Sequence, residues 1–437
     1  MALTFSNSEL YGNLFGDPEL TELVDEKAAI AGMIRFERAL ARVQGGLGVI
    51  PALSGQAIDA ALKDLAVSSK TLAPGVAATG VAVPALVTEL RKHLPSEHGQ
   101  FLHWGATSQD VIDTAHVICW DTATRLLASR LATLLDILED QSRAQARTVM
   151  AGRTRSQIAT PITFGLRIAQ WAAPMIEAET GLRPMRNALL KIQFGGASGG
   201  NTALAPNGPA IAAGLAQELG LRSAPPWHTN RTGPLALVNW LGGLAIALDK
   251  MATDLMVMSR SEIQEARAGQ GGGSSTMPQK ANPVSAEALS VLCHIARSAQ
   301  AAFSMAKAHA EERDGVAWTL EWTLIPQMLW AIGAALAHAT TLARTVQADP
   351  DRMAAQLTTN SGAMAEAASF ILADTMPRAE AQALVKQIAA SGAPLIEALE
   401  KNVPGIDWRA QLHPDAAIAP CTQIAEQVFA TRRSPGI

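Results

Sequence analysis

A loop near the middle of the chain carries side chains that suit proton transfer beside a carboxylate. The run 273–283 contains Ser274, Lys280 and Asn282, and several glycines just before it make its entry flexible. If the lysine and the amide hold a carboxylate, a serine above its α-carbon can move a proton at that carbon. The other interpretation is a surface loop with a solvated lysine. The run therefore predicts a mobile loop that binds a carboxylate.

A second group of polar side chains lies ahead of a predicted helix. Thr107, Ser108 and Gln109 precede a helical stretch from Val111, and His103 stands a few residues earlier. Free N–H groups at a helix N-terminus attract anions, so these side chains form a candidate carboxylate cradle. Taken alone, the two hydroxyls are also typical helix caps, and His103 is also typical of a hydrogen-bonded packing histidine.

Two further segments carry arginine. The hydroxyl and guanidinium groups of 152–157 can grip a carboxylate, although a solvated helix start explains them equally well. In the segment 311–322, Arg313 stands near Trp318, a pairing that suits a flat, anionic, conjugated ligand. Its charges also fit a solvated helix end. The candidate contacts in and after the first segment are Thr154, Arg155, Gln157 and Thr160.

Composition narrows the class of protein. The chain has 437 residues, of which 48% are hydrophobic and 4% aromatic, a balance that favours alanine- and leucine-rich helices over sheets. A net charge of −4 gives no electrostatic reason to expect nucleic acid or anionic lipid as a partner. The cysteines and histidines have no metal-ligand spacing, so we expect neither a metal nor a cofactor.

Targeting and membrane signals are weak. The first residues lack the basic start and apolar core of a signal peptide, so we expect a cytoplasmic protein. The most apolar long stretch, 235–248, is too short to span a bilayer and indicates a buried helix. We therefore expect no membrane partner.

Helical spacing recurs over long windows, and alternating strand patterns are nearly absent. The predicted fold is all-α, with long helices in succession that form an elongated antiparallel bundle. These helices are expected at 111–149, 163–193, 237–267, 284–310 and 324–346. Prolines break shorter helices on either side of them, which predicts three domains, 1–105, 106–350 and 351–437.

The run 273–283 closely resembles the signature of the fumarase/aspartase superfamily, and the other segments occur in the order of that superfamily along essentially the whole chain. The resemblance implies a homotetramer with a central helical bundle, whose active sites are each assembled from three subunits. It also implies that Ser274 transfers the proton, that Lys280 and Asn282 bind a substrate carboxylate, and that Glu287 supports the site.

Within this superfamily, His103-Trp-Gly-Ala-Thr-Ser-Gln-Asp, Gln193-Phe-Gly-Gly-Ala and the pair Glu321-Trp322 are most similar to the members that cyclise 3-carboxy-cis,cis-muconate to a lactone. This similarity implies a small anionic tricarboxylate as substrate. The implied substrate contacts are His103, Thr107, Ser108, Gln109, Thr154, Arg155, Gln157, Thr160, Met277, Arg313 and Trp318.

Arg155 is a departure, because many lyases of the superfamily have histidine at its position. A histidine acid is useful when an amine leaves, whereas a carboxylate with a pKa of about 4 needs no such proton. Two alternatives stay open. Another lyase of the superfamily is one, although adenylosuccinate lyase expects arginine where this chain has Trp322. A non-catalytic helical scaffold is the other, against which the retained Ser274, Lys280 and Asn282 argue.

Overall fold

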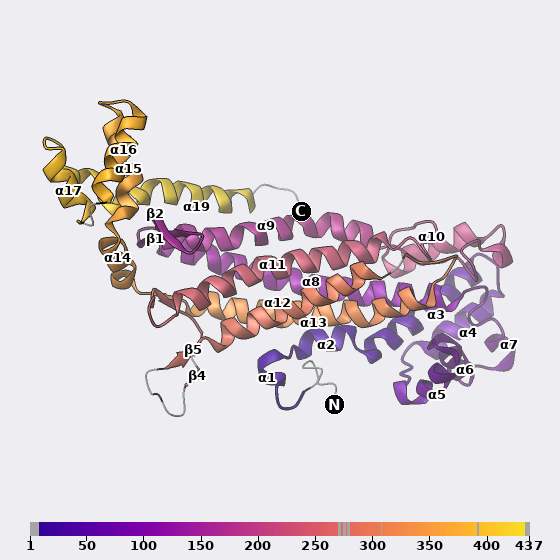
Figure 1. Cartoon of the computed structure of the whole chain (residues 1–437). Coiled ribbons are helices and arrows are strands. Elements are labelled where there is room, and N and C mark those ends of the chain that lie inside the picture. Colours follow the sequence, from indigo (N-terminus) through magenta and orange to yellow (C-terminus); the bar gives the residue numbers. More distant parts are fainter. Residues whose placement is uncertain are drawn as a thin grey trace. The chain divides into compact units, whose positions relative to one another are not determined.

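The computed structural model describes residues 8–269, 272–273, 277, 280–306, 308–390 and 393–432. The chain forms two compact units. Unit 1 comprises residues 1–130, 181–246 and 292–335, and unit 2 comprises residues 131–180, 247–291 and 336–437. Helices make up most of each unit (Figure 1), which confirms the predicted all-α class.

The long helices lie close to their expected positions, and each contributes residues to both units. They are α8 (Ser108–Ala144), α9 (Phe164–Leu189), α11 (Thr232–Met258), α12 (Val284–Met305) and α13 (Gly315–Thr345). The boundaries differ from the expected ones at several ends: α9 ends at Leu189 and α12 at Met305, a few residues early, and two other ends differ more. The helix expected to reach residue 267 ends at Met258, because the chain turns there and Ala266–Arg267 (β3) pairs with Gln347–Ala348 (β6). The helix expected from residue 324 begins earlier, at Gly315, and continues through Pro326.

Shorter helices complete unit 1. They are α1 (Gly12–Phe15), α2 (Pro18–Val24), α3 (Glu26–Gly46), α4 (Ala52–Leu62), α5 (Ser69–Thr79), α6 (Val83–Arg91), α7 (Ser96–Gly99) and α10 (Gly208–Leu219). Asp25 caps α3 by accepting the Ala28 N–H at 2.8 Å. The apolar face of α3, including Phe36 and Leu40, is buried in a core that α4, α6, α8 and α10 share. This core fixes the buried face of α3 beside the loop that leads into α8.

A glutamine side chain links two of the long helices in unit 1. A Cβ atom on Gly242 of α11 would lie 2.0 Å from Oε1 of Gln300 on α12, so a larger residue there would require the Gln300 side chain to move. The same Gln300 donates to Asn239 of α11. Gln300 therefore connects α12 to α11 within unit 1.

Unit 2 contains a β-hairpin that the sequence patterns missed. The segment 152–157 was interpreted as a possible helix start, but it joins β1 (Val149–Thr154) to β2 (Gln157–Thr163). Arg155 and Ser156 form the two-residue turn, both with positive φ (50° and 66°), as a type I′ turn requires. The helix expected over 111–149 is shorter for the same reason, because β1 begins at Val149.

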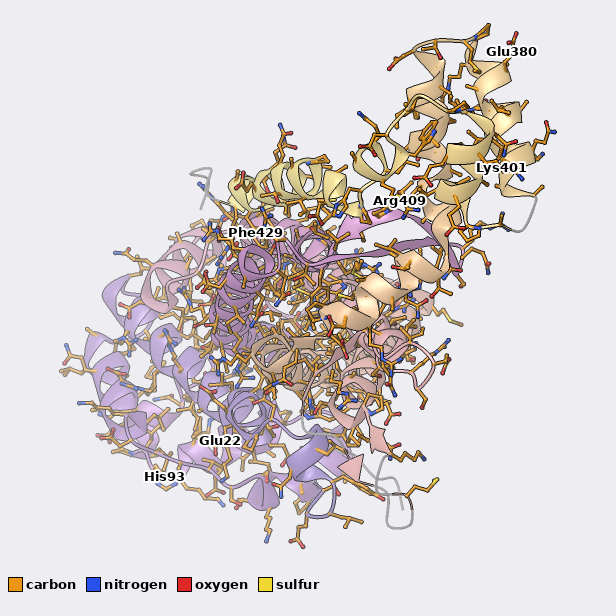
Figure 2. All side chains as sticks on the ribbon, turned by 90° about the vertical axis from the view of Figure 1, so that its left-hand side faces the viewer. Glu22, His93, Glu380, Lys401, Arg409 and Phe429 are labelled. Atoms are coloured by element: carbon orange, nitrogen blue, oxygen red, sulfur yellow. The ribbon has the colours of Figure 1, made fainter. Side chains whose placement is uncertain are left out.

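The C-terminal part of unit 2 has a small core of its own. Its helices are α14 (Pro350–Thr359), α15 (Ala365–Ala373), α16 (Arg378–Ala389), α17 (Leu395–Asn402), α18 (Trp408–Gln411) and α19 (Ile418–Arg432). Trp408, fully buried, packs with apolar side chains of α15, α16 and α17. Figure 2 shows the exposed side chains of Glu380, Lys401 and Arg409 on these short helices.

Two helices are long and apolar enough to cross a membrane by length and composition, α11 and α13. The apolar stretch 235–248 belongs to α11, a helix of 27 residues that is longer than the stretch itself, and the expected buried helix is confirmed. Of the apolar windows in the two helices, 61% and 67% are buried inside the protein. Burial of this kind is what a core helix of a bundle shows.

Candidate active site

The N-terminus of α8 and the start of α13 meet in unit 1 around Arg313. Its Nε–H donates to Gln109 Oε1 at 2.9 Å, and its terminal nitrogen donates to Thr107 Oγ1 and to the Ala197 carbonyl, both at 3.1 Å. These acceptors are neutral, and in the described parts of the chain no carboxylate pairs with Arg313. The positive charge of the guanidinium is therefore not compensated by a carboxylate. It lies beside the N-terminus of α8, and a helix N-terminus also attracts anions.

Asp110 explains how the cradle keeps its shape. This fully buried carboxylate accepts the N–H groups of Gly195 at 2.8 Å, Gly196 at 3.0 Å and Thr107 at 3.0 Å. The bond to Thr107 is the return half of a capping box, and the other two tie the glycine-rich loop to the helix. Asp110 thus organises the backbone of the site rather than facing a ligand.

A buried ion-pair network lies next to this cradle. Arg231 contacts both oxygens of Asp113, at 2.6 and 3.1 Å, and also donates to Glu321. Burial alone would raise the pKa of Asp113, but the guanidinium outweighs it and holds that pKa below its ordinary value. Burial likewise opposes the charge of Arg231, but Asp113 and Glu321 raise its pKa well above the usual value. In contrast to Arg313, the charge of Arg231 is compensated.

Trp318 belongs to the same network. Its side chain is 3% exposed, its indole N–H donates to Asp113 at 2.8 Å, and its ring centroid lies 5.9 Å from the Arg313 guanidinium carbon. Gln109 bridges the two groups, because it donates to Asp113 at 3.2 Å while accepting from Arg313. The structure thus places Trp318 against Arg313 as a support, and its expected contact with substrate stays a prediction.

The remaining predicted residues of unit 1 lie around this cradle. Ser108 is the first residue of α8 and half-buried. His103 lies on the loop before it, with Nδ1 2.6 Å from Glu37 Oε1. Thr107, Gln109 and Trp318 contact Arg313, and His103 and Ser108 lie on the segment that leads into α8 and at its first residue.

Unit 2 carries the other predicted residues. Thr154, Arg155, Gln157 and Thr160 are exposed on the hairpin or its turn. The other arginine of this hairpin, Arg153, instead makes two 2.8 Å bonds to buried Glu265, which fixes the hairpin to the segment after α11. The hairpin thus has one structural arginine and presents the other, Arg155, to solvent.

The signature loop is flanked by a short two-stranded ribbon. Gly272–Gly273 (β4) pairs with Ala281–Asn282 (β5), and the Lys280 N–H donates to the Met277 carbonyl at 3.0 Å. Lys280 and Met277 are exposed, and Glu287 is exposed in the first turn of α12. Ser274 lies outside the described residues.

Sequence reasoning missed Glu37, Arg231 and His228 as parts of the site. His228 is 5% exposed and its Nε2 lies 3.4 Å from Asp110. Local spacing gave no signal for them, because their partners lie far away in the sequence. In the described residues, no group of three or more histidine, cysteine, aspartate or glutamate side chains could hold a metal ion.

Comparisons with known proteins show the family to which the chain belongs. A family model described as lyase matches residues 16–297. The 3-carboxy-cis,cis-muconate cycloisomerase of Bradyrhizobium diazoefficiens is 34% identical over 388 residues, 87% of this chain and 86% of that protein. The protein of the same name from Pseudomonas aeruginosa is 35% identical over 388 residues, 87% of this chain and 84% of that protein. The crystal structure of 3-carboxy-cis,cis-muconate lactonizing enzyme from Pseudomonas putida matches with a TM-score of 0.89 and 29% sequence identity, over 98% of this chain and 99% of that one.

Proposed function

This chain belongs to the lyase family, within the fumarase/aspartase superfamily, and from that premise we propose that it interconverts 3-carboxy-cis,cis-muconate and 4-carboxymuconolactone. The similarity to proteins that carry the cycloisomerase name supports this choice, because it extends over most of both chains. The substrate is a small tricarboxylate, and the enzyme is an intramolecular lyase.

One observation carries the proposal. Arg313 is held by Gln109 and Thr107 through hydrogen bonds that do not neutralise it. A guanidinium in such a place attracts a carboxylate strongly, because its planar donors match the two carboxylate oxygens. Nearby Arg231 shows the opposite arrangement, with two carboxylates already bound. We therefore assign a structural role to Arg231 and substrate binding to Arg313.

The reaction requires charge stabilisation more than acid catalysis at the attacking group. A carboxylate oxygen of the substrate bonds to the alkene carbon that bears the 3-carboxyl group, and this closes the lactone ring. The electron pair of that alkene moves toward the conjugated carboxylate, which becomes an enediolate. A proton then adds to the carbon between the ring and this carboxylate. Fixed positive charges and N–H donors lower the energy of the doubly charged intermediate.

In this proposal Ser274 delivers the proton and removes it in the reverse direction. Lys280 and Asn282 hold the carboxylate on which charge collects, and Glu287 supports them. Lys280 is exposed, so its ammonium group is accessible to a substrate carboxylate. Thr154, Arg155, Gln157 and Thr160 face the substrate from the hairpin, and no cofactor takes part.

The working form is a cytoplasmic homotetramer whose sites each draw on three subunits. An exposed stripe on the first half of α11 supports assembly: Leu235, Asn239, Gly243 and Ile246 recur at helical spacing. Leu235 is 38% exposed and Ile246 is 55% exposed. Two large apolar side chains exposed on one helix face are typical of a surface that another subunit covers.

An absorbance assay tests the function. The purified protein is mixed separately with 3-carboxy-cis,cis-muconate, adenylosuccinate, argininosuccinate and fumarate. We expect turnover of the muconate alone. Turnover of adenylosuccinate instead would favour a different lyase of the superfamily. No turnover of any of the four compounds would favour a non-catalytic scaffold or another substrate.

A further inference from the structure

A histidine and a buried glutamate form a close pair beside the proposed site. His103 Nδ1 lies 2.6 Å from Oε1 of Glu37, a residue of α3 whose side chain is fully buried. The other oxygen of Glu37, Oε2, is buried and has no hydrogen-bond partner in the described residues. Among the described residues, His103 is thus the only side chain that hydrogen-bonds this carboxylate.

A buried carboxylate is unstable unless it is paired or protonated. Three charged groups face His103 from the elements around it: Glu37 on α3, Asp110 on α8 and Arg91 on α6. Burial and the Arg91 guanidinium lower the pKa of His103, but the carboxylates outweigh them, Glu37 more than Asp110, and the pKa lies above its ordinary value. The pairing therefore favours an imidazolium facing a carboxylate.

The buried face of α3 also fixes the loop that carries this histidine. His103 has a φ of 64°, in the left-handed region, which histidine adopts more readily than most residues. Gln44 of α3, fully buried, donates to the Trp104 carbonyl at 2.8 Å. Glu37 and Gln44 are two helical turns apart on one face of α3, so this helix hydrogen-bonds two neighbouring loop residues, His103 and Trp104.

The far side of the ring is available to a ligand. His103 Nε2 has no partner in the part of the chain that the structure describes, and the side chain is 19% exposed. The loop continues to Thr107, which accepts from Arg313. The imidazole therefore belongs to the same short segment as the carboxylate cradle.

We propose that Glu37 is a positioning residue that holds His103 as an imidazolium, whose Nε2–H binds a carboxylate of the anionic substrate. The inference rests on the proposed function for the identity of that substrate. It adds a second fixed cation to the cradle of Arg313, which suits a ligand with several negative charges. No covalent step passes through Glu37, because it acts on the substrate only through the ring.

Histidine NMR tests the imidazolium without reference to activity. In protein labelled at histidine ¹³Cε1, the His103 signal is assigned as the one missing in His103→Gln and is followed against pH. We expect a protonated ring at pH 7 in the wild-type protein, and a midpoint at lower pH in Glu37→Gln, which keeps the shape of the side chain. A neutral ring at pH 7 in the wild-type protein overturns the proposal, even if the variant fails to fold.

Kinetics test the link to substrate. We expect Glu37→Gln to lower kcat/KM at pH 7.5 by roughly 10- to 100-fold, the range for a hydrogen bond to a charged group. The loss of activity with rising pH should begin at lower pH in this variant. Adding Glu37→Gln to His103→Gln should cause no further loss, and full additivity of the two effects contradicts the proposal.

Gln44→Leu provides the matched control, because it removes the neighbouring α3 tether without removing a charge. It should lower activity while leaving the pH profile unshifted. An equal shift in Gln44→Leu would assign the effect to loop disorder and overturn the role of Glu37. If the muconate is not turned over by any variant while the NMR midpoint still falls in Glu37→Gln, the proposed function fails and the Glu37–His103 pairing stands.

Discussion

Gln109 and Arg313 are joined by a 2.9 Å hydrogen bond from the guanidinium Nε–H to the amide oxygen, while no carboxylate in the described residues neutralises the arginine. The same Gln109 donates to Asp113, whose charge Arg231 already compensates. Gln109 thus lies between the Arg231–Asp113 ion pair, in which the charges compensate each other, and Arg313, whose charge has no such partner. This arrangement leaves the charge of Arg313 for a ligand.

We expect Arg313→Lys to lower kcat/KM by about 100-fold, mainly through KM. Lysine keeps the charge but cannot bond Gln109 and Thr107 while presenting a planar pair of donors to a carboxylate. Steady-state kinetics with 3-carboxymuconate measure the effect. Arg378→Lys is the control, because Arg378 stacks on Phe370 in the C-terminal helices. Equal losses in both variants would contradict a specific role for Arg313.

Arg155 should contribute to binding through its charge rather than through the shape of its turn. Arg155→Gly removes the guanidinium while suiting the positive φ of 50°, and Ser156→Gly makes the same kind of change one residue later without losing a charge. We expect the first variant to raise KM roughly fivefold at low salt and less at high salt, because an exposed ion pair is weak and screened. An unchanged KM at every ionic strength would show that Arg155 does not reach the substrate.

The long helices could be predicted because apolar residues recur at helical spacing over many turns. The hairpin could not, because Arg155 and Ser156 lack the glycine or asparagine that usually marks a type I′ turn. Its strands are also short, and β2 contains Pro161, which weakens a strand pattern.

The sequence segments that form the candidate site could be predicted, but the contacts between charged residues of different segments could not. Hydroxyls and amides before a helix start pointed to the cradle around Thr107. The partners of Arg231 lie 118 and 90 residues away, at Asp113 and Glu321, and no local pattern states which acid meets which arginine. Glu37 was missed for the same reason, since it meets His103 across 66 residues.

His116 should make the native state less stable in mild acid. Burial lowers its pKa from 6.5 to about 4, so unfolding takes up a proton between these two values. The native state should therefore lose about 2 kcal/mol of unfolding free energy per subunit between pH 7 and pH 5 through this group. Urea unfolding at the two pH values measures the loss, and His116→Phe, which keeps an aromatic ring against Trp120, should reduce it. Identical pH dependence in both proteins would refute this assignment.

The exposed stripe on α11 should be an assembly surface. We expect Ile246→Glu to dissociate the proposed tetramer and abolish activity, because burying an unpaired carboxylate in an interface is costly. Light scattering after size-exclusion chromatography gives the oligomeric mass. Ile424→Glu on α19 is the control, since that isoleucine is similarly exposed, at 48% against 55%. A tetramer that survives Ile246→Glu would place the interface elsewhere.

The central claim is that the chain cyclises 3-carboxymuconate with proton delivery by Ser274. The most direct measurement is the proton NMR spectrum of the product formed in D₂O. We expect a lactone whose methylene beside the free carboxylate carries one deuteron in a single configuration, and a loss of at least about 100-fold in rate for Ser274→Ala. No lactone from the wild-type protein, or undiminished turnover in Ser274→Ala, would contradict the claim.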